Sequence, residues 1–165
     1  MPSDDDYKDL RLTVAAARIM RQVTERALDR GFLVWDDGTV PALAMWTLLR
    51  WERKVGLVAL EQMGVDLPSI EREVDALLNR KKEEHPFVYP KTHQPVSLDW
   101  MPYITPFLDA ASNEAQLLGH DYVGTEHLLL AVVRGADAEL LSLLNRFGIS
   151  REALAKAILD LLRGT

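Results

Sequence analysis

The densest group of side chains that could do chemistry lies between residues 119 and 130. Two histidines and two acids, His120, Asp121, Glu126 and His127, fall close together there. Imidazole nitrogens and carboxylate oxygens are ligands that zinc and other transition metals accept. Their spacing matches no known zinc-protease or zinc-ribbon pattern, and His120 and Asp121 lie in a turn between two glycines. We therefore interpret them as turn and helix-start residues, and we expect no metal and no cofactor.

Other catalytic chemistries find no support in the sequence. The chain has no cysteine, which excludes disulfides, thiolate metal sites and cysteine nucleophiles. No serine, histidine and aspartate share a recognisable motif context. The chain contains no Gly-x-x-x-x-Gly-Lys-Ser/Thr run, so it cannot hydrolyse ATP by that route. We predict a protein that is not an enzyme; a catalytic function on a helical scaffold stays open as an alternative.

Composition narrows the classes of partner. The chain has 165 residues, 48% of them hydrophobic and 27% charged, with a formal net charge of −6. This length fits one ordinary domain or two small ones. No basic face dominates, which argues against nucleic acid as a partner. Apolar runs fall well short of the roughly 20 residues that span a bilayer, and the acidic start is unlike a signal peptide. We expect no membrane partner and a cytoplasmic location.

The apolar spacing is helical along the chain, and no useful alternating strand pattern occurs. It predicts an all-α fold. The expected helices are 13–30, 42–51, 53–63 and 67–81, followed by 104–118, 125–134, 137–147 and 151–163. Trp46 and Trp51 lie five residues apart and do not share one helix face cleanly. We expect each to fill the core; the alternative is one in the core and one exposed, which would be a docking candidate.

The two sets of four helices repeat each other. Shifted back by 84 residues, Gly148 falls on Gly64 and the expected helix cap Ser150 falls on Asp66. Core positions follow the same register, so Leu144 falls on Leu60 and Leu161 on Leu77. Chance seldom matches a glycine stop, a cap and several core positions together. We expect two like halves with all four of these leucines buried.

The register also divides the chain. Gly119 matches Gly31 only at a shift of 88, so the first half carries about four extra residues, which we expect to protrude as a mobile loop over Phe32 to Thr39. We predict a flexible N-terminus over 1–12, a first repeat over 13–81 and a second repeat over 102–165. A connector over 82–101 contains prolines and a charge run, and we expect it to be extended.

The repeat and its motif resemble the Clp N-terminal repeat. The run from Ala115 to Leu130 is similar to that family's signature almost residue for residue, and Phe147-Gly148-Ile149 continues it. The first half is divergent but keeps Leu60-Glu61-Gln62-Met63-Gly64-Val65. The resemblance implies one all-α unit in which two four-helix repeats pack with pseudo-twofold symmetry. In that family the unit precedes an ATPase ring and receives substrates or adaptor proteins.

The resemblance also implies binding residues. In some members one glutamate per repeat binds the guanidinium group of a phosphorylated arginine, and a threonine at the start of the first helix of each repeat assists. Glu126 is the matching acid of the second repeat, whereas the first repeat has Ala42 there. Thr13 fits the threonine position of the first repeat, and Thr105 lies one turn beyond that of the second. We expect Thr125 to cap its helix and Glu126 to face solvent.

The function implied is a non-catalytic protein- or peptide-binding module of the Clp chaperone-protease system. Its partners would be a Clp unfoldase, its adaptors or arginine-phosphorylated clients, and it would act as adaptor, substrate receptor or decoy. Two alternatives stay open, a structural protein that forms homo-oligomers and the excised N-domain of a larger ATPase. Met1 and the acidic start favour a complete small protein.

Overall fold

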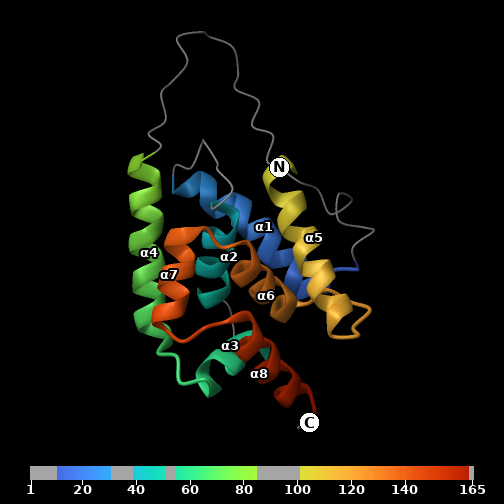
Figure 1. Ribbon diagram of the computed structural model, residues 1–165. Coiled ribbons are helices and arrows are strands. Elements are labelled where there is room, and N and C mark those ends of the chain that lie inside the picture. The colour runs from blue at the N-terminus through green and yellow to red at the C-terminus, as the bar shows by residue number, and fades with distance from the viewer. Residues whose placement is uncertain (1–10, 31–38, 51–54, 85–100, 164–165) are drawn as a thin grey trace.

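The structure is a computed structural model that describes residues 11–30, 39–50, 55–84 and 101–163. The described residues form helices and no named strand, which confirms the all-α prediction (Figure 1). The first four helices are α1 (Val14–Asp29), α2 (Thr39–Arg50), α3 (Val55–Gln62) and α4 (Leu67–Glu84). The second four are α5 (Met101–Leu117), α6 (Thr125–Gly135), α7 (Ala138–Arg146) and α8 (Arg151–Arg163).

Three helix boundaries differ by three residues from the sequence prediction: the beginnings of α2 and α5, the latter at Met101 rather than 104, and the end of α4. Helix α2 begins at Thr39, which is buried rather than part of a protruding loop. Residues 32–38 of that expected loop lie outside the described residues, as does Trp51, whereas Trp46 is 8% exposed and belongs to the core. Helix α4 continues through the charge run to Glu84, so the extended connector expected from residue 82 was wrong at its beginning.

Lys81, the first residue of the charge run, makes an ion pair with the other repeat. Lys81 is 5% exposed and donates a hydrogen bond to the carboxylate of Asp137. Asp137 also accepts a hydrogen bond from the Leu140 N–H at 3.0 Å, as the N-cap of α7. The charge run therefore includes a contact between repeats, which the sequence pattern could not reveal.

Most of the helix contacts come in equivalent pairs, as a pseudo-twofold axis requires, although α3 packs on α6 without an equally close contact of α7 with α2. Helix α1 packs on α2 as α5 packs on α6, and α2 packs on α4 as α6 packs on α8. Between the repeats, α3 packs on α8 as α7 packs on α4, and α1 packs on α6 as α5 packs on α2. Helices α2 and α6 are equivalent to each other and are in direct contact. The two like halves predicted from the sequence are therefore present.

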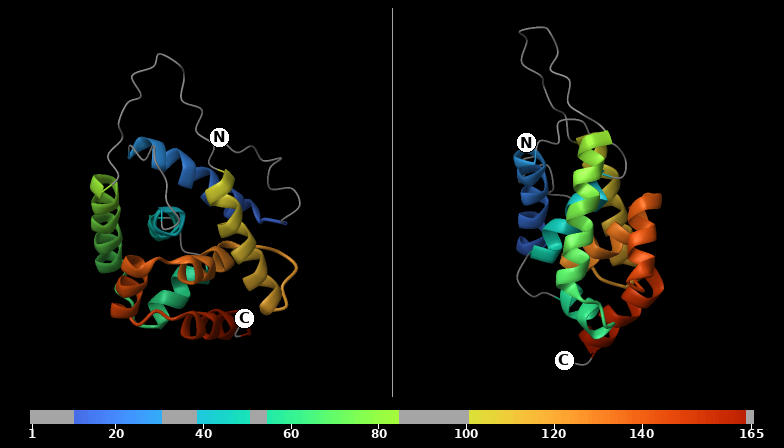
Figure 2. Two further views of the ribbon diagram at one scale, coloured as in Figure 1. Left: turned by 45° about the horizontal axis from the view of Figure 1, so that its top comes forward. Right: turned by 90° about the vertical axis from the view of Figure 1, so that its left-hand side faces the viewer.

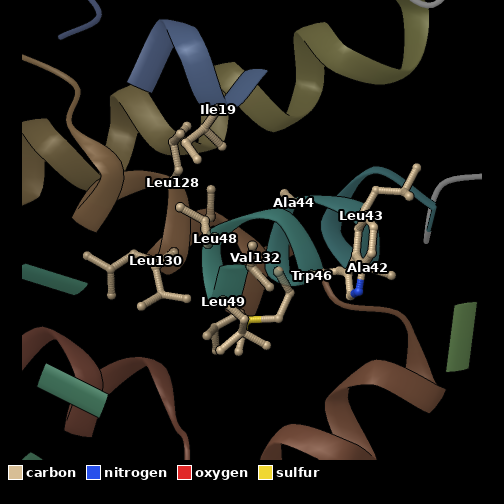
Figure 3. Close-up of a cluster of buried hydrophobic side chains, with 14 of the residues drawn as sticks. Ile19, Ala42, Leu43, Ala44, Trp46, Leu48, Leu49, Leu128, Leu130 and Val132 are labelled. Carbon is tan, nitrogen blue, oxygen red and sulfur yellow. The ribbon is translucent and has the colours of Figure 1, made fainter. Parts of the chain in front are cut away.

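The core is centred on α2 and α6. Every residue of α2 from Thr39 to Leu49 and every residue of α6 from Thr125 to Val133 is buried. Figure 2 shows α2 end-on with α1, α4 and α5 around it. Side chains from α1, α2 and α6 meet in the close-up of Figure 3, where Ile19, Leu48 and Leu128 are labelled.

The four equivalent leucines test the repeat register. Leu60, Leu77 and Leu144 are fully buried, as expected. Leu161 is only partly buried against the core, because it lies in the last turns of α8 near the edge of the fold. The prediction was therefore wrong for Leu161. Burial of a leucine stabilises a fold by roughly 1.5–3 kcal/mol, so the three enclosed residues carry most of this contribution.

The glycine helix ends and the serine N-cap expected from the sequence are present. Gly64 and Gly148 have φ values of 83° and 74°, the left-handed conformation that ends a helix. The Ser150 hydroxyl accepts the Ala153 N–H at 3.1 Å, as an N-cap does. Within the described ranges, no helix combines the length and the apolar character that crossing a membrane requires.

Candidate functional site

A glycine turn positions the histidine- and acid-containing motif between α5 and α6. Gly119 has a φ of 76°, and the His120 N–H donates to the Ala115 carbonyl at 2.9 Å. These features end α5 in the manner of a left-handed glycine cap. The chain then passes through His120, Asp121 and Tyr122, and seven residues separate the end of α5 from the beginning of α6.

Helix α6 begins with an unusual cap. The N-cap residue is Gly124, which has no side chain to donate or accept a hydrogen bond, so the expectation that Thr125 caps the helix was wrong. Thr125 is the first helical residue and is buried. His127, three residues after the N-cap, accepts the Gly124 N–H on Nδ1 at 2.9 Å. Histidine thus takes the place that glutamate or glutamine has in a capping box.

The two histidines form a directed hydrogen-bond chain. His127 Nε2 lies 2.8 Å from His120 Nδ1. Because His127 Nδ1 accepts the Gly124 N–H, the proton of neutral His127 resides on Nε2, which donates to His120. Burial is the largest cause that lowers the pKa of His127 below its ordinary value, which favours this neutral form.

This chain of donors bears on metal binding. His120, Glu126 and His127 offer ligand atoms within 4.8 Å of one another. A metal at His127 Nε2 would require that nitrogen to lose its proton, and Nδ1 would then have to donate to a backbone N–H that is itself a donor. The donor set therefore fits a hydrogen-bond relay and fits a metal ion poorly. Nδ1 also lies 3.8 Å from Glu126 Oε1, but an unprotonated nitrogen makes no ion pair there.

Glu126 is buried rather than facing solvent, which contradicts the sequence expectation. Its side chain is folded back over Gly124, and a Cβ atom added to Gly124 would lie 2.6 Å from Glu126 Oε2. The missing side chain of Gly124 therefore leaves the space that the Glu126 carboxylate occupies. The signature pattern marks the glycine but not the reason for it.

Tyr122 covers the same carboxylate. Burial is the largest cause that raises the pKa of Tyr122, and the charge of Glu126 and a hydrogen bond to Glu126 raise it further. The phenol ring stacks on His120, with 5.1 Å between centroids and 11° between planes, and meets His127 edge-on at 5.2 Å. Tyr122 thus lies between the two imidazoles and Glu126. Sequence reasoning missed this residue because a tyrosine in a turn carries no signal of its own.

Thr13 belongs to this site although it comes from the other repeat. The Thr13 N–H donates to the Val123 carbonyl at 2.9 Å, and the Val123 N–H donates to the Arg11 carbonyl at 3.1 Å. Leu12 and Val123 form a parallel bridge, so the part of the predicted flexible N-terminus that is described, Arg11 and Leu12, is ordered by pairing. Residues 1–10 lie outside the described residues.

The start of α1 thereby meets the start of α6. The Thr13 hydroxyl accepts the Ala16 N–H at 3.1 Å and caps α1. Val123, its backbone partner, directly precedes Gly124 and lies three residues before Glu126. The sequence had paired threonine and glutamate within each repeat; the structure pairs the threonine of one repeat with the loop of the other.

Thr105 is not part of this arrangement. It is exposed in the second turn of α5. The remaining twelve residues of α5 put it about 18 Å along the helix from the turn that holds His120. Ala42, the counterpart of Glu126, is fully buried on α2, so the first repeat offers no carboxylate at that place.

A cleft of about 250 Å³ opens beside the paired segments. Tyr122 lines this cleft, whereas Glu126, whose charge helps to raise the pKa of Tyr122, is not part of the lining. The walls combine a cation, an acid and several polar groups from α5 and from both paired segments: Arg11, Ser112, Ala115, Gln116, His120, Asp121, Tyr122 and Val123.

A buried ion network is centred on α5, the helix that also lines the cleft. Glu114 on α5 is fully buried, and Arg151 binds it through Nε at 3.1 Å and Nη2 at 2.9 Å. Arg134 adds a bond to the same carboxylate at 3.1 Å. The network joins α5, α6 and α8. Sequence reasoning did not identify it, because a single glutamate in an amphipathic helix predicts an exposed residue.

Comparison with known proteins agrees with the geometry. The model of the Clp repeat N-terminal domain matches residues 45–147 and 102–164. The chain is similar to the negative regulator of genetic competence ClpC/MecB of Bacillus subtilis, with 28% identity over 92% of this chain and 17% of that protein. It is also similar to the chaperone protein ClpB of Oceanobacillus iheyensis, with 30% identity over 70% of this chain and 13% of that protein. The chain thus spans less than a fifth of these relatives.

Proposed function

Because the chain belongs to the Clp repeat N-terminal domain family, we propose that it is a non-catalytic module that binds polypeptides for the Clp chaperone-protease system. Its ligand would be an arginine side chain of a client, free or phosphorylated, bound where α1 and α6 meet. The observation that carries the proposal is the Thr13–Val123 backbone pairing, which brings the threonine of one repeat to the glutamate loop of the other.

The chemistry of the site suits a guanidinium group. A carboxylate accepts two parallel hydrogen bonds from arginine, and Glu126 is held in place by Gly124 and Tyr122 before a ligand arrives. Glu126 is 6% exposed, so the Tyr122 hydroxyl must move aside for the guanidinium to reach it. Tyr122 lines the open cleft and can rotate into that space.

The same site suits a phosphoryl group attached to the guanidinium. The Val123 segment adjoins the N-termini of α1 and α6, and the positive end of a helix dipole favours anions. Arg11 lines the adjoining cleft and supplies a full positive charge. Phosphorylation of the arginine should therefore strengthen binding.

The direct test is calorimetric titration of the full chain with a peptide that contains one arginine, phosphorylated and unphosphorylated. We expect Glu126→Gln to weaken binding more than tenfold, because loss of a charged hydrogen bond costs about 1.5–3 kcal/mol. Thr105→Ala is the matched control, since Thr105 is exposed and distant from the site. Equal weakening by both variants, or no binding by the wild type, would contradict the proposal.

A second experiment separates the possible roles. The chain is added to a Clp unfoldase and its protease during degradation of an arginine-phosphorylated client. Faster degradation identifies an adaptor or substrate receptor, and slower degradation identifies a decoy. In either case Glu126→Gln should remove the effect.

A further inference from the structure

The two repeats have opposite charges at one equivalent position. Helices α1 and α5 correspond at an offset of 88 residues and the later helices at 84, so Arg26 is the counterpart of Glu114 and Arg50 is the counterpart of Arg134. In the second repeat Glu114 supplies the carboxylate that Arg134 and Arg151 bind. In the first repeat an arginine stands where that carboxylate would be.

The arginines of the first repeat gather around Trp46 instead. The guanidinium carbons of Arg26, Arg30 and Arg50 lie 5.3, 4.7 and 5.1 Å from the centroid of its ring. Arg30 is also bound by Asp75 at 2.6 Å, and Arg50 by Glu71 at 2.8 Å. Arg26 has no such acid among the described contacts.

Two buried donors at this cluster have no acceptor. Trp46 Nε1 and Arg26 Nε are inaccessible to solvent and make no hydrogen bond, and they are the buried side-chain atoms of the described residues with this property. Buried N–H groups nearly always find a partner in folded proteins. Two such groups beside one ring, at the place where the other repeat holds a carboxylate, point to a missing acceptor.

An open groove leads to the cluster. It has a volume of about 390 Å³ between α2 and α4, and its lining is Trp46, Arg50, Pro68, Glu71, Arg72 and Asp75. Trp46 lies one helical turn after Ala42, the position that lost its acid (Figure 3). Four arginines and two acids surround the groove, so the local balance is positive.

We propose that this groove binds a carboxylate side chain of an acidic polypeptide segment, in the place that Glu114 fills in the second repeat. Arg50 is half exposed on its outer side and moves off the ring to admit the ligand. Trp46 Nε1 and the arginines then donate to the carboxylate oxygens. A carboxylate fits better than a doubly charged phosphate, because Glu71 and Asp75 already offset part of the positive charge.

The test uses the full chain and a fluorescein-labelled peptide of repeated Gly-Glu units, with a Gly-Gln peptide as its neutral match. Fluorescence anisotropy at low ionic strength should show binding of the first and at least about tenfold weaker binding of the second. Arg50→Gln should weaken binding of the acidic peptide about tenfold. Arg134→Gln, the same position of the second repeat, should leave it unchanged, because Glu114 already fills that place.

Two more variants probe the donors. Trp46→Phe keeps an aromatic ring but removes Nε1–H, and should weaken acidic-peptide binding several-fold. Arg26→Glu supplies the missing carboxylate within the chain; it should abolish peptide binding and raise the melting temperature by a few degrees, as an internal ligand would. If Arg26→Glu does not fold, the comparison of Arg50→Gln with Arg134→Gln still tests the proposal.

Three results would overturn the proposal. The first is equal affinity for the Gly-Glu and Gly-Gln peptides, and the second is equal weakening by Arg50→Gln and Arg134→Gln, as expected of diffuse electrostatics. The third is displacement of the peptide by inorganic phosphate at concentrations where acetate has no effect. Glu126→Gln should not alter acidic-peptide binding, so this proposal and the arginine site on α6 stand or fall separately.

Discussion

Arg151 binds the fully buried carboxylate of Glu114 through two of its nitrogens, at 3.1 and 2.9 Å. Glu114 is the main cause that raises the pKa of Arg151, through this hydrogen bonding. The pair joins the first and last helices of the second repeat. The pair matters for stability mainly because Glu114 is buried, and a buried charge that loses a partner lowers the free energy of unfolding.

Arg151→Ala should therefore lower the free energy of unfolding by about 2–3 kcal/mol, because Arg134 alone remains to bind Glu114. Urea denaturation followed by circular dichroism measures this loss. Arg146→Ala is the matched control: its partner Glu73 lies 3.3 Å away in an exposed pair, which contributes less than about 1 kcal/mol. Equal losses in the two variants would contradict the structural role of Glu114.

Thr13→Ala should lower stability by about 1 kcal/mol, because the hydroxyl that caps α1 is lost. Thr13→Ser keeps the hydroxyl and should match the wild type within a few tenths of a kcal/mol. Thermal unfolding of the three proteins in one buffer makes the comparison. A loss as large in the serine variant would assign the effect to the threonine methyl group instead.

His127 makes stability depend on pH. Burial lowers its pKa in the folded state below the ordinary 6.5, so the unfolded chain binds its proton first as the pH falls. The contribution of neutral His127 is complete above pH 6.5 and is lost progressively below it, as the pH approaches the folded pKa. His127→Gln keeps a capping-box acceptor without the titration, and should lose less stability between pH 7.5 and 5.5. A parallel loss in both proteins would contradict this assignment.

Gly124→Ala should displace the Glu126 carboxylate while leaving the fold intact. The backbone at Gly124 is extended, with φ −103° and ψ −178°, which alanine also adopts. The new Cβ meets only the end of the flexible Glu126 side chain, at 2.6 Å. We expect stability to change by less than about 1 kcal/mol, while arginine-peptide binding falls about as much as in Glu126→Gln. Wild-type affinity in this variant would show that Glu126 need not keep its position.

The helices were predictable because the spacing of apolar residues and the glycine stops are local features. Gly64, Gly148 and the Ser150 cap behave as the sequence indicates. The composition of the site was not predictable, since it depends on which repeat contacts which. Nothing near Thr13 in the sequence indicates that it pairs with Val123, and the periodicity around Glu114 does not indicate that two distant arginines enclose it.

The cap of α6 shows a different limit. A threonine before an apolar helix predicts a hydroxyl cap. The cap is instead Gly124, whose N–H donates to His127 Nδ1, three residues after the cap. The propensity rule places the helix start within one residue but assigns its chemistry to the wrong side chain. Such exceptions occur where a side chain has another use, here the space over Gly124 that Glu126 fills.

The contacts between the two repeats bear on whether the fold needs an unbroken chain. Helix α3 packs on α8, α4 on α7, and the segment before α1 on the loop before α6, so a large part of what each repeat buries is supplied by the other. A peptide bond cut between Glu84 and Met101 would break none of these contacts. The two pieces would stay together as a heterodimer, and pieces made separately would each lack a complete core until mixed.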